Sequence, residues 1–537
     1  MTLHVPISTT HSPRSTRLAR MLVVSTAVLG LTVPMTQPGS ATGGGTPATD
    51  KYWQTHTSSH TKTPSAAAPR TIVTTDPELD DLNSLLRMLL YSNEIDIAGL
   101  VYSSSQHHYQ GDASRGLEPH RWPAPGARLH IDEAVDAYAK VYGNLVRHDP
   151  RYPSPSRLRS LIATGNITDE GDMAADTKGS DLIRKVLLDD KPGQVFLQAW
   201  GGPNTIARAL KSIQDQYQGT PRWRAIYKKI VNKAVITSFG QQDSTFEDYI
   251  KPNWPDIQNR EVATSVWGYG SRGVVRPEDT VYHSADWTRA NVSGTGPIGA
   301  SYRVWGDGKQ MAAGFDDEDY FGLSGYTAEE LRAMGYLVWT PPQPKGSWIS
   351  EGDSSNFALL VDNGLRSYQH PGWGGWGGRQ VVDPDDPHRW SNQNARDADA
   401  TGATPRDYAA ARWFSAIQND FAARLDWSVS KFADANHAPR VRVPQGLDIS
   451  RRAGRTVELT SRTADPDGDT VTRTWWQYRE AGTYPGTVGI RHTKTGAVRV
   501  DIPADARPGQ TIHLIVEAKD NGTPALTSYQ RVVITVT

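Results

Sequence analysis

The residues with the clearest chemical potential are the carboxylates of residues 74–81, which read TTDPELDD. Asp76, Asp80 and Asp81 are close together in the chain, and carboxylates crowded in this way repel one another unless a cation or protons lie between them. Hard oxygen ligands of this kind suit Ca²⁺. The alternative is that Asp80 and Asp81 merely cap a helix and interact with its positive end. This segment alone leaves both interpretations open.

The surrounding elements predict where these carboxylates lie. Residues 71–75 read as a buried strand, residues 82–90 have helical apolar content, and residues 95–102 read as a second strand. The same alternation recurs in helical residues 180–188 and 205–214 and in strand residues 195–199 and 233–239. Strands alternating with helices predict an α/β fold with a mostly parallel sheet. Ligands of such sheets bind beyond the carboxyl ends of the strands, which is where the carboxylates fall.

On these residues the chain resembles the nucleoside hydrolases, in which a strand leads into an Asp-Pro-x-x-Asp-Asp signature that opens a helix. The resemblance implies that Asp76 binds calcium and takes a proton from the attacking water. It also implies that Asp80 binds sugar hydroxyls and that Asp81 is a calcium ligand. This division agrees with general chemistry, because metal coordination lowers the pKa of bound water and an adjacent carboxylate can deprotonate it.

A second segment of the resemblance is the turn after residues 195–199, where GPNTIA resembles the family's Gly-Pro-x-Thr-x-x-Ala. The resemblance implies that Thr205 lends a backbone carbonyl to the calcium, and Asn204 is expected among the substrate ligands. An ordinary helix start, with Asn204 or Thr205 as its N-cap, is the alternative.

A third segment is Glu351-Gly352-Asp353, far downstream. In nucleoside hydrolases a late His-Asp pair lies here, so the resemblance implies that Asp353 is the last calcium carboxylate. Gly352 stands where the histidine would be, and Glu351 is the nearest titratable group, so Glu351 is a second catalytic candidate. A departing nucleobase needs protonation or hydrogen bonding, and the loss of the histidine therefore argues against nucleoside cleavage itself.

The run HPGWGGWGGR over residues 370–379 narrows the resemblance to secreted, cellulose-binding, nucleoside-hydrolase-like proteins of bacteria, in which a β-sandwich closes the chain. Trp373 or Trp376 could stack on a sugar and Arg379 could bind a hydroxyl or carboxylate. The alternative is a tight structural loop in which glycines surround a packed Trp. Asn253 resembles the family's asparagine near the terminal hydroxyl of the sugar, and a plain loop is the alternative there.

Composition limits the classes of function. Lys+Arg 57 against Asp+Glu 58 gives a formal net charge of -1, so neither a nucleic-acid polymer nor an anionic membrane is an expected partner. Cysteine is absent, so a metal site must use oxygen or imidazole ligands. The chain has 17 tryptophans, and aromatic faces of this kind suit the apolar faces of sugars.

The order of composition along the 537 residues predicts several parts. Basic residues precede the apolar run 21–33, so residues 1–41 are expected to be a signal peptide, and the run is short of the ~20 residues that a membrane anchor needs. Beyond it the prediction is a linker over residues 42–69, a nucleoside-hydrolase-like domain over 70–432 that ends with a helix at 405–421, a linker over 433–440 and an immunoglobulin- or cadherin-like β-sandwich over 441–537.

The sequence therefore predicts a secreted, calcium-dependent hydrolase that acts on a glycosyl bond of a carbohydrate or glycoside and associates with plant polysaccharide, with cellulose as a candidate partner. The alternative is a cellulose- or carbohydrate-binding protein that keeps a hydrolase fold without turnover, which the missing histidine and the many tryptophans favour. Nucleoside salvage outside the cell is a third possibility. Fold alone does not distinguish these functions.

Overall fold

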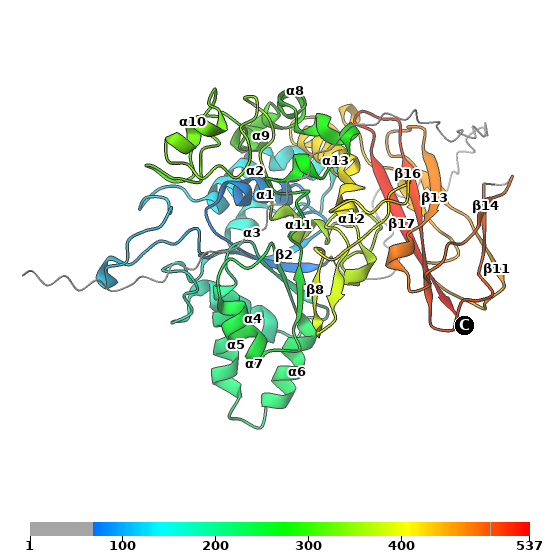
Figure 1. Ribbon diagram of the computed structural model, residues 1–537, viewed down its shortest axis with the longest axis horizontal. Helices are drawn as coiled ribbons and strands as arrows, with labels where there is room; N and C mark the ends of the chain where they lie inside the picture. The colour runs from blue at the N-terminus through cyan, green and yellow to red at the C-terminus, as the bar shows by residue number, and fades with distance from the viewer. Residues whose placement is uncertain (1–67, 495) are drawn as a thin grey trace, which may run out of the picture. The chain divides into compact units, whose positions relative to one another are not determined.

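The central element is an eight-stranded sheet in the order β3-β2-β1-β4-β5-β6-β8-β7 (Figure 1). The computed structural model describes residues 68–494 and 496–537, so the predicted signal peptide and almost all of the first linker lie outside the described residues. Neighbouring strands are parallel except for β7 and β8. The strands are β1 (Arg70–Thr75), β2 (Asp96–Tyr102), β3 (Ile162–Thr164), β4 (Val195–Ala199), β5 (Ala234–Ser238), β6 (Gln258–Glu261), β7 (Val381–Asp383) and β8 (Asp386–Ser391). The predicted α/β fold with a mostly parallel sheet is confirmed.

Helices cover both faces of this sheet, because both faces of its central strands are apolar. Val73 of β1 packs into one core and its neighbour Ile72 into the other, as the alternation of side chains along a strand requires. The first core is covered by α1 (Leu79–Leu89), α2 (His130–His148) and α13 (Phe414–Trp427), and the second by α4 (Lys178–Leu188), α5 (Asn204–Tyr217) and α6 (Trp223–Lys233). Figure 1 shows the two groups of helices on opposite sides of the strands.

The start of α1 sets the positions of the carboxylates. The helix begins at Leu79, three residues earlier than the apolar pattern predicts, so Asp80 and Asp81 lie in its first turn. Glu78 is the N-cap residue and makes no capping hydrogen bond through its side chain. Asp80 and Asp81 therefore do not cap α1, and both are buried.

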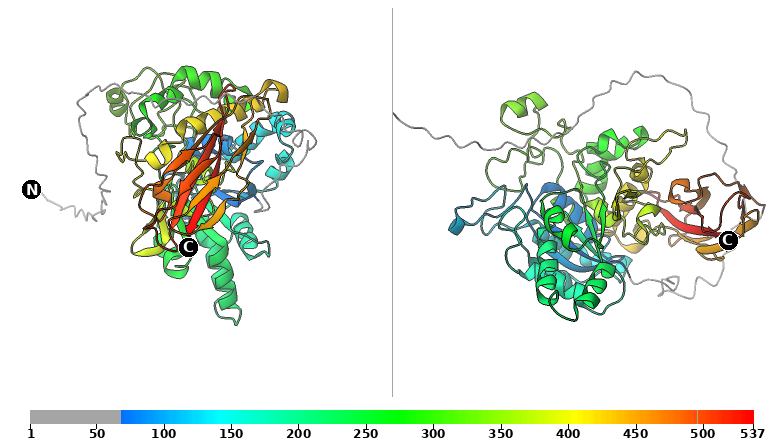
Figure 2. Two further views of the ribbon diagram at one scale, coloured as in Figure 1. Left: turned by 90° about the vertical axis from the view of Figure 1, so that its right-hand side faces the viewer. Right: turned by 60° about the horizontal axis from the view of Figure 1, so that its bottom comes forward.

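The C-terminal region is a separate set of small, mostly antiparallel sheets around its own apolar core (Figure 2). The largest has the order β10-β17-β16-β13, and the others are β11-β15-β14 and β12-β9. The strands are β9 (Arg440–Arg442), β10 (Asp448–Arg451), β11 (Thr456–Leu459), β12 (Arg462–Ala464), β13 (Thr472–Gln477), β14 (Ile490–His492), β15 (Val498–Asp501), β16 (Thr511–Lys519) and β17 (Thr527–Val536). The prediction of an all-β second region is confirmed.

Two further observations concern the whole described chain. Residues 68–537 belong to one compact unit, so contacts between the α/β region and the C-terminal β region are part of its packing. No helix within the described residues is both long and apolar enough to cross a membrane.

Candidate functional site

The site lies where β1, β2, β4 and β5 end at the same edge of the sheet. β1 pairs in parallel with β2 on one side and β4 on the other, so the loops that follow these strands meet. Asp76 directly follows β1, and the loop after β2 carries Ser105 and His108. Because these strands are parallel and paired in register, the residues that directly follow each strand lie at this edge of the sheet.

Asp76 is completely buried and is held by the loop that follows β2. Its Oδ2 accepts a hydrogen bond from the Ser105 hydroxyl and lies 3.2 Å from His108 Nδ1. Burial acts to raise the pKa of Asp76, but the hydrogen bond and charge of His108 and the hydrogen bond from Ser105 outweigh it and hold this pKa below its usual value. Asp76 is thus a charged carboxylate in the interior, and its Oδ1 has no hydrogen-bond partner among the described residues.

The other carboxyls of the cluster resist ionisation. Asp80 Oδ2 accepts hydrogen bonds from Ser350 Oγ and the Gly352 backbone N–H, each at 3.2 Å, yet burial raises its pKa to about 6. Burial also raises the pKa of Asp81 and of Asp353 well above the usual range, and the charges of neighbouring carboxylates add to the shift. Four acidic side chains from two distant segments therefore share one buried volume.

Glu78 stands at the outer side of this cluster. Its Oε1 accepts a 3.4 Å hydrogen bond from the Tyr269 hydroxyl. Burial, followed by the charges of Asp80 and Asp76, raises the pKa of Glu78 well above its usual value. Glu78 belongs to both groups of side chains here whose ligand atoms lie within 4.8 Å of one another, the first with Asp76 and His108 and the second with Asp80 and Asp81.

The donor set fits a hard divalent cation. Asp81 Oδ1 accepts a hydrogen bond from the Thr75 hydroxyl, whereas Asp81 Oδ2, Asp353 Oδ1 and Asp76 Oδ1 are buried with no hydrogen-bond partner among the described residues. Buried carboxylate oxygens without partners are costly unless a proton or a cation satisfies them. A divalent cation would neutralise the mutual repulsion of these groups, and oxygen ligands are those that Ca²⁺ and Mg²⁺ take.

Thr205 and Asn204 reach the same edge from the loop after β4. Thr205 Oγ1 accepts a 2.9 Å hydrogen bond from the Asn166 backbone N–H, and Asn204 Nδ2 donates to Ser104 Oγ at 2.9 Å. Pro203 is the N-cap residue of α5, and no side chain caps this helix. The two side chains therefore tie neighbouring loops together, and their expected roles as a calcium ligand and a substrate ligand stay predictions.

Glu351 lies in a different environment from the one that its catalytic assignment requires. Its carboxylate is fully buried, forms an ion pair with Arg87 of α1, and accepts a hydrogen bond from the Tyr302 hydroxyl. Arg87 in turn lies over the Phe421 ring, with 3.6 Å between Cζ and the ring centroid. Glu351 has its partners inside the core, so these contacts argue against a catalytic role and indicate a structural one.

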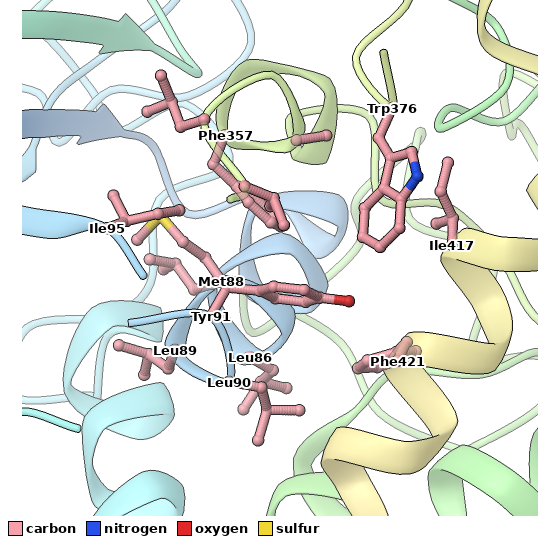
Figure 3. Packing of buried hydrophobic residues seen from close by; sticks show 14 of the residues in the cluster. Leu86, Met88, Leu89, Leu90, Tyr91, Ile95, Phe357, Trp376, Ile417 and Phe421 are labelled. Carbon is pink, nitrogen blue, oxygen red and sulfur yellow. The ribbon is translucent and has the colours of Figure 1, made fainter. Parts of the chain in front are cut away.

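The GWGGWGGR run also packs inside the molecule. Trp376 is 2% exposed and meets Tyr91 edge to face at 6.4 Å, among the apolar side chains of α1 and α13 (Figure 3). Arg379 Nε pairs with Asp397 Oδ1 at 2.7 Å, and Trp373 meets His513 of the C-terminal region edge to face at 5.3 Å. Burial therefore favours the structural-loop interpretation for Trp376, whereas Trp373 and Arg379 are half-buried and their expected contacts with a sugar stay predictions.

Asn253 does not join the cluster either. It ends α7 (Lys251–Asn253), and its Oδ1 accepts a 3.1 Å hydrogen bond from Gln214 Nε2 of α5. Its Nδ2 donates to the Tyr249 carbonyl at 2.8 Å. Both ends of its amide are used in packing against α5 and the turn that precedes α7, which favours a structural role for Asn253 over a contact with the sugar.

The structure adds residues that the sequence analysis did not single out. A cleft adjoins the cluster, and its lining includes Glu78, His108, Arg121, Tyr269, Glu318 and Trp339. Arg121 Nη1 pairs with Glu318 Oε2 at 2.7 Å. His108 follows a predicted strand in the run SSSQHH, so the strand-end argument that selected Asp76 could have selected it. Arg121 and Glu318 come from loops without periodicity and had no comparable signal.

Comparisons with known proteins agree with this architecture. Residues 70–380 match the family described as "Cellulose-binding Sde182, nucleoside hydrolase-like domain", and residues 456–536 match "Cellulose-binding protein Sde0182, C-terminal domain". No curated protein is significantly similar in sequence.

Among solved structures, a nucleoside hydrolase-related hypothetical protein from Saccharophagus degradans, associated with carbohydrate metabolism, is 25% identical, covers 88% of this chain and 100% of its own, and has a TM-score of 0.64. A plant nucleoside hydrolase is 14% identical, covers 68% of this chain and 100% of its own, and has a TM-score of 0.29, which is too low to show a shared fold. Since the first family match spans more than half of the 537 residues and the second follows it in order, the chain belongs to the Sde182 family of cellulose-binding, nucleoside-hydrolase-like proteins.

Proposed function

We propose that this protein binds a plant-type polysaccharide such as cellulose and hydrolyses a glycosyl bond with the help of bound Ca²⁺. The observation that carries the proposal is the buried set of carboxylates at the end of β1, three of whose oxygens have no hydrogen-bond partner among the described residues. Such a set is costly in a folded core unless protons or a cation satisfy it. The family's description as cellulose-binding supports a carbohydrate as the substrate or partner.

Asp76 is the group best suited to accept a proton. Its Oδ2 is fixed by Ser105 and His108, which leaves Oδ1 as the atom that takes a proton from water. Its low pKa keeps it charged and ready to do so near neutral pH. A bound calcium ion would lower the pKa of a coordinated water. Asp81, Asp353 and the Thr205 carbonyl would be its further ligands.

Asp80 and the cleft residues are suited to orient a sugar. Asp80 Oδ2 accepts hydrogen bonds from Ser350 and Gly352, and these bonds fix the orientation of the carboxyl group. A carboxyl group held in this way can form hydrogen bonds with sugar hydroxyls. The cleft beside it is lined by charged and aromatic side chains, among them Arg121, Glu318 and Tyr269. Hydroxyl-rich ligands suit a wall of this kind, because each charged group can make several hydrogen bonds.

A carbohydrate-binding protein without turnover is the second candidate. One observation favours it: Glu351, the titratable group nearest to the missing histidine, is engaged by Arg87 and Tyr302 and so does not serve a leaving group. Binding and hydrolysis make different predictions for the same variants, because binding needs the cleft and hydrolysis also needs the proton acceptor.

Secretion and the domain boundaries are part of the proposal. The chain is exported through residues 1–41, its hydrolase-like domain spans residues 70–432, and its β-sandwich spans residues 441–537 after the linker 433–440. N-terminal sequencing of protein recovered from the culture medium tests the first point, since a mature chain that begins near residue 42 is expected. A chain that keeps its first residues and stays with the cells would contradict secretion.

Asp76→Asn tests hydrolysis. We expect release of reducing sugar from a panel of polysaccharides and glycosides to fall by at least about 10²-fold, because the proton acceptor is lost, while circular dichroism shows that the fold is retained. Asp286→Asn, which changes a carboxylate that is 87% exposed, is the matched control and should retain activity. Polysaccharide binding by the wild type without turnover on any glycoside or nucleoside would instead select the binding protein.

A further inference from the structure

Exposed large apolar side chains are concentrated on one short stretch of the chain. Among the residues that the structure describes, nine such side chains are exposed, and five of them fall within residues 315–339. These are Phe315, Tyr326, Met334, Leu337 and Trp339. Phe315 is 64% exposed and Trp339 is 50% exposed, and no other tryptophan of the described chain is exposed. A patch of this kind on a folded protein marks a binding surface.

The stretch is held in place by the side chains beneath it. The Leu337 backbone N–H donates to the Asp317 carbonyl at 2.7 Å, so residues near 337 run beside residues near 317. The Phe315 ring lies 5.0 Å from the ring of buried Tyr336, and Tyr336 packs on Tyr320 at 6.2 Å. α10 (Ala328–Ala333), at the upper edge of Figure 1, lies within this stretch. The exposed Phe315 ring therefore stands on a packed base.

The patch is continuous with the cleft beside the carboxylate cluster. Trp339 is exposed and also lines the cleft together with Glu78 and Tyr269. The Tyr269 ring stacks on Phe321 at 4.9 Å, and Phe321 belongs to the same apolar base as Tyr336. A ligand seated on Trp339 would therefore extend toward Glu78 and the buried carboxyls.

The other aromatic candidates are already occupied by internal packing. Trp475 lies in the core of the C-terminal sheets, and Trp476 lies against the α/β region, with its ring 4.5 Å from Arg412 Cζ. No large apolar side chain among the described residues of 440–537 is exposed. The C-terminal region therefore offers no exposed aromatic platform among these residues.

We infer that Phe315 and Trp339 form a platform on which a β-linked glucan chain lies with its sugar rings flat against the two aromatic side chains, one end directed into the cleft. This inference rests on the proposed carbohydrate function and locates the binding surface for it. A glucan fits because its pyranose faces are apolar and match aromatic rings, while its hydroxyl groups can meet Arg121, Asp316 and Glu318 at the cleft. An apolar protein partner would cover this charged group of side chains with atoms that cannot hydrogen-bond to it, which costs affinity.

The test is binding of the full chain to insoluble cellulose, measured as a depletion isotherm in calcium-containing buffer. We expect Phe315→Ala/Trp339→Ala to weaken binding by at least about tenfold, as loss of exposed aromatic anchors does at other interfaces. The single variant Trp339→Phe, which keeps an aromatic face, should retain most of the binding of the wild type. Phe432→Ala is the control, because it removes an aromatic side chain that is 41% exposed and lies outside residues 315–339. This variant should bind cellulose as the wild type does.

Three outcomes would overturn the inference, and they differ in what they say of the proposed function. If the wild type binds cellulose and the double variant binds equally well, the platform is wrong and the carbohydrate function stands. If the wild type binds neither cellulose nor soluble cello-oligosaccharides, the carbohydrate function fails with it. If the double variant changes only sedimentation of the chain, the patch is a contact between copies. Melting temperature and calcium calorimetry of each variant separate these results from misfolding.

Discussion

The buried carboxyls at the end of β1 differ in how readily each loses its proton, and this difference predicts how metal binding depends on pH. Burial raises the pKa of Asp80 to about 6, and it raises those of Asp81 and Asp353 well above the usual value. A cation must displace protons from these groups. Calcium affinity is therefore expected to fall as the pH is lowered, because its ligands Asp81 and Asp353 hold their protons more tightly than ordinary carboxyls do, and calcium binding is expected to release protons where these groups still hold them.

The same shifts give the direction of the stability change. A group whose pKa is raised by folding stabilises the folded state when it is protonated, so the metal-free cluster destabilises the protein most at high pH. The gain in melting temperature on adding calcium should thus be larger near pH 8 than near pH 5. Thermal scans with calcium and with chelator at both pH values check this, and an equal gain at both would contradict a site made of these carboxyls.

Glu351 gives a second prediction at the scale of single residues. Glu351→Gln leaves Arg87 buried without its charged partner, so the free energy of unfolding should fall by about 3–5 kcal/mol. Glu278→Gln changes a carboxylate that is 64% exposed in its pair with Arg276, and it should cost no more than about 1 kcal/mol. Denaturant titration compares the two. Unchanged stability of Glu351→Gln together with lost turnover would restore the catalytic role.

Single residues were predictable to different extents for physical reasons. Asp76, Asp80 and Asp81 adjoin a strand with a clear apolar pattern, so their place at the edge of the sheet follows from the sequence. Glu351 lies in a loop, and its direction is decided by Arg87, which comes from a segment more than 250 residues away. Trp376 is likewise directed inward by α1 and α13. Such long-range packing leaves no local pattern.

At the scale of elements, the close packing of the loop after β4 makes this loop sensitive to substitution. A Cβ added to Gly202 would meet Asp243 Oδ2 at 2.1 Å and the Ser104 carbonyl at 2.7 Å. Gly202→Ala must therefore displace the loop that carries Asn204 and Thr205. We expect lower stability and weaker calcium binding, measured by thermal scanning and calorimetry.

A matched glycine provides the control for this substitution. Gly143 lies within α2, and a Cβ there would meet nothing within 4 Å. Gly143→Ala should therefore raise stability by about 0.5–1 kcal/mol, because alanine has the higher helix propensity. If Gly202→Ala behaved like Gly143→Ala, the close approach of the loops would not be needed for the site.

The elements themselves were predictable where their residues are apolar and periodic. β1, β2, β4 and β5 are buried strands and were anticipated within a residue or two of their ends. β6 reads QNRE, which has no apolar run, although its Arg260 is buried. β6 is held by its neighbours in the sheet more than by its own composition. α2 differs, because its buried residues, among them Ile131, Val135 and Tyr138, recur at helical spacing, so the sequence does carry a signal for this helix.

At the scale of the whole molecule, the two regions are joined through buried polar contacts that the domain order alone did not indicate. Arg531 of β17 is fully buried, and its guanidinium donates to the Leu365 and Gly374 carbonyls, the latter at 2.9 Å. The Tyr478 hydroxyl donates to Asp397, which also pairs with Arg379. The glycine- and tryptophan-rich run thus serves as a docking loop for the C-terminal sheets.

This docking predicts that the chain unfolds as one cooperative unit. Buried carbonyls bound to a buried guanidinium cost free energy when that partner is removed, so neither region is expected to unfold while the other stays native. Calorimetry of the wild type should show a single transition. In Arg531→Met the Leu365 and Gly374 carbonyls lose their donor, and the transition should split into two. Arg499→Met, which removes an exposed arginine of β15, should keep the single transition. Two resolved transitions in the wild type would show instead that the regions are thermodynamically independent and that the buried contacts between them do not couple their unfolding.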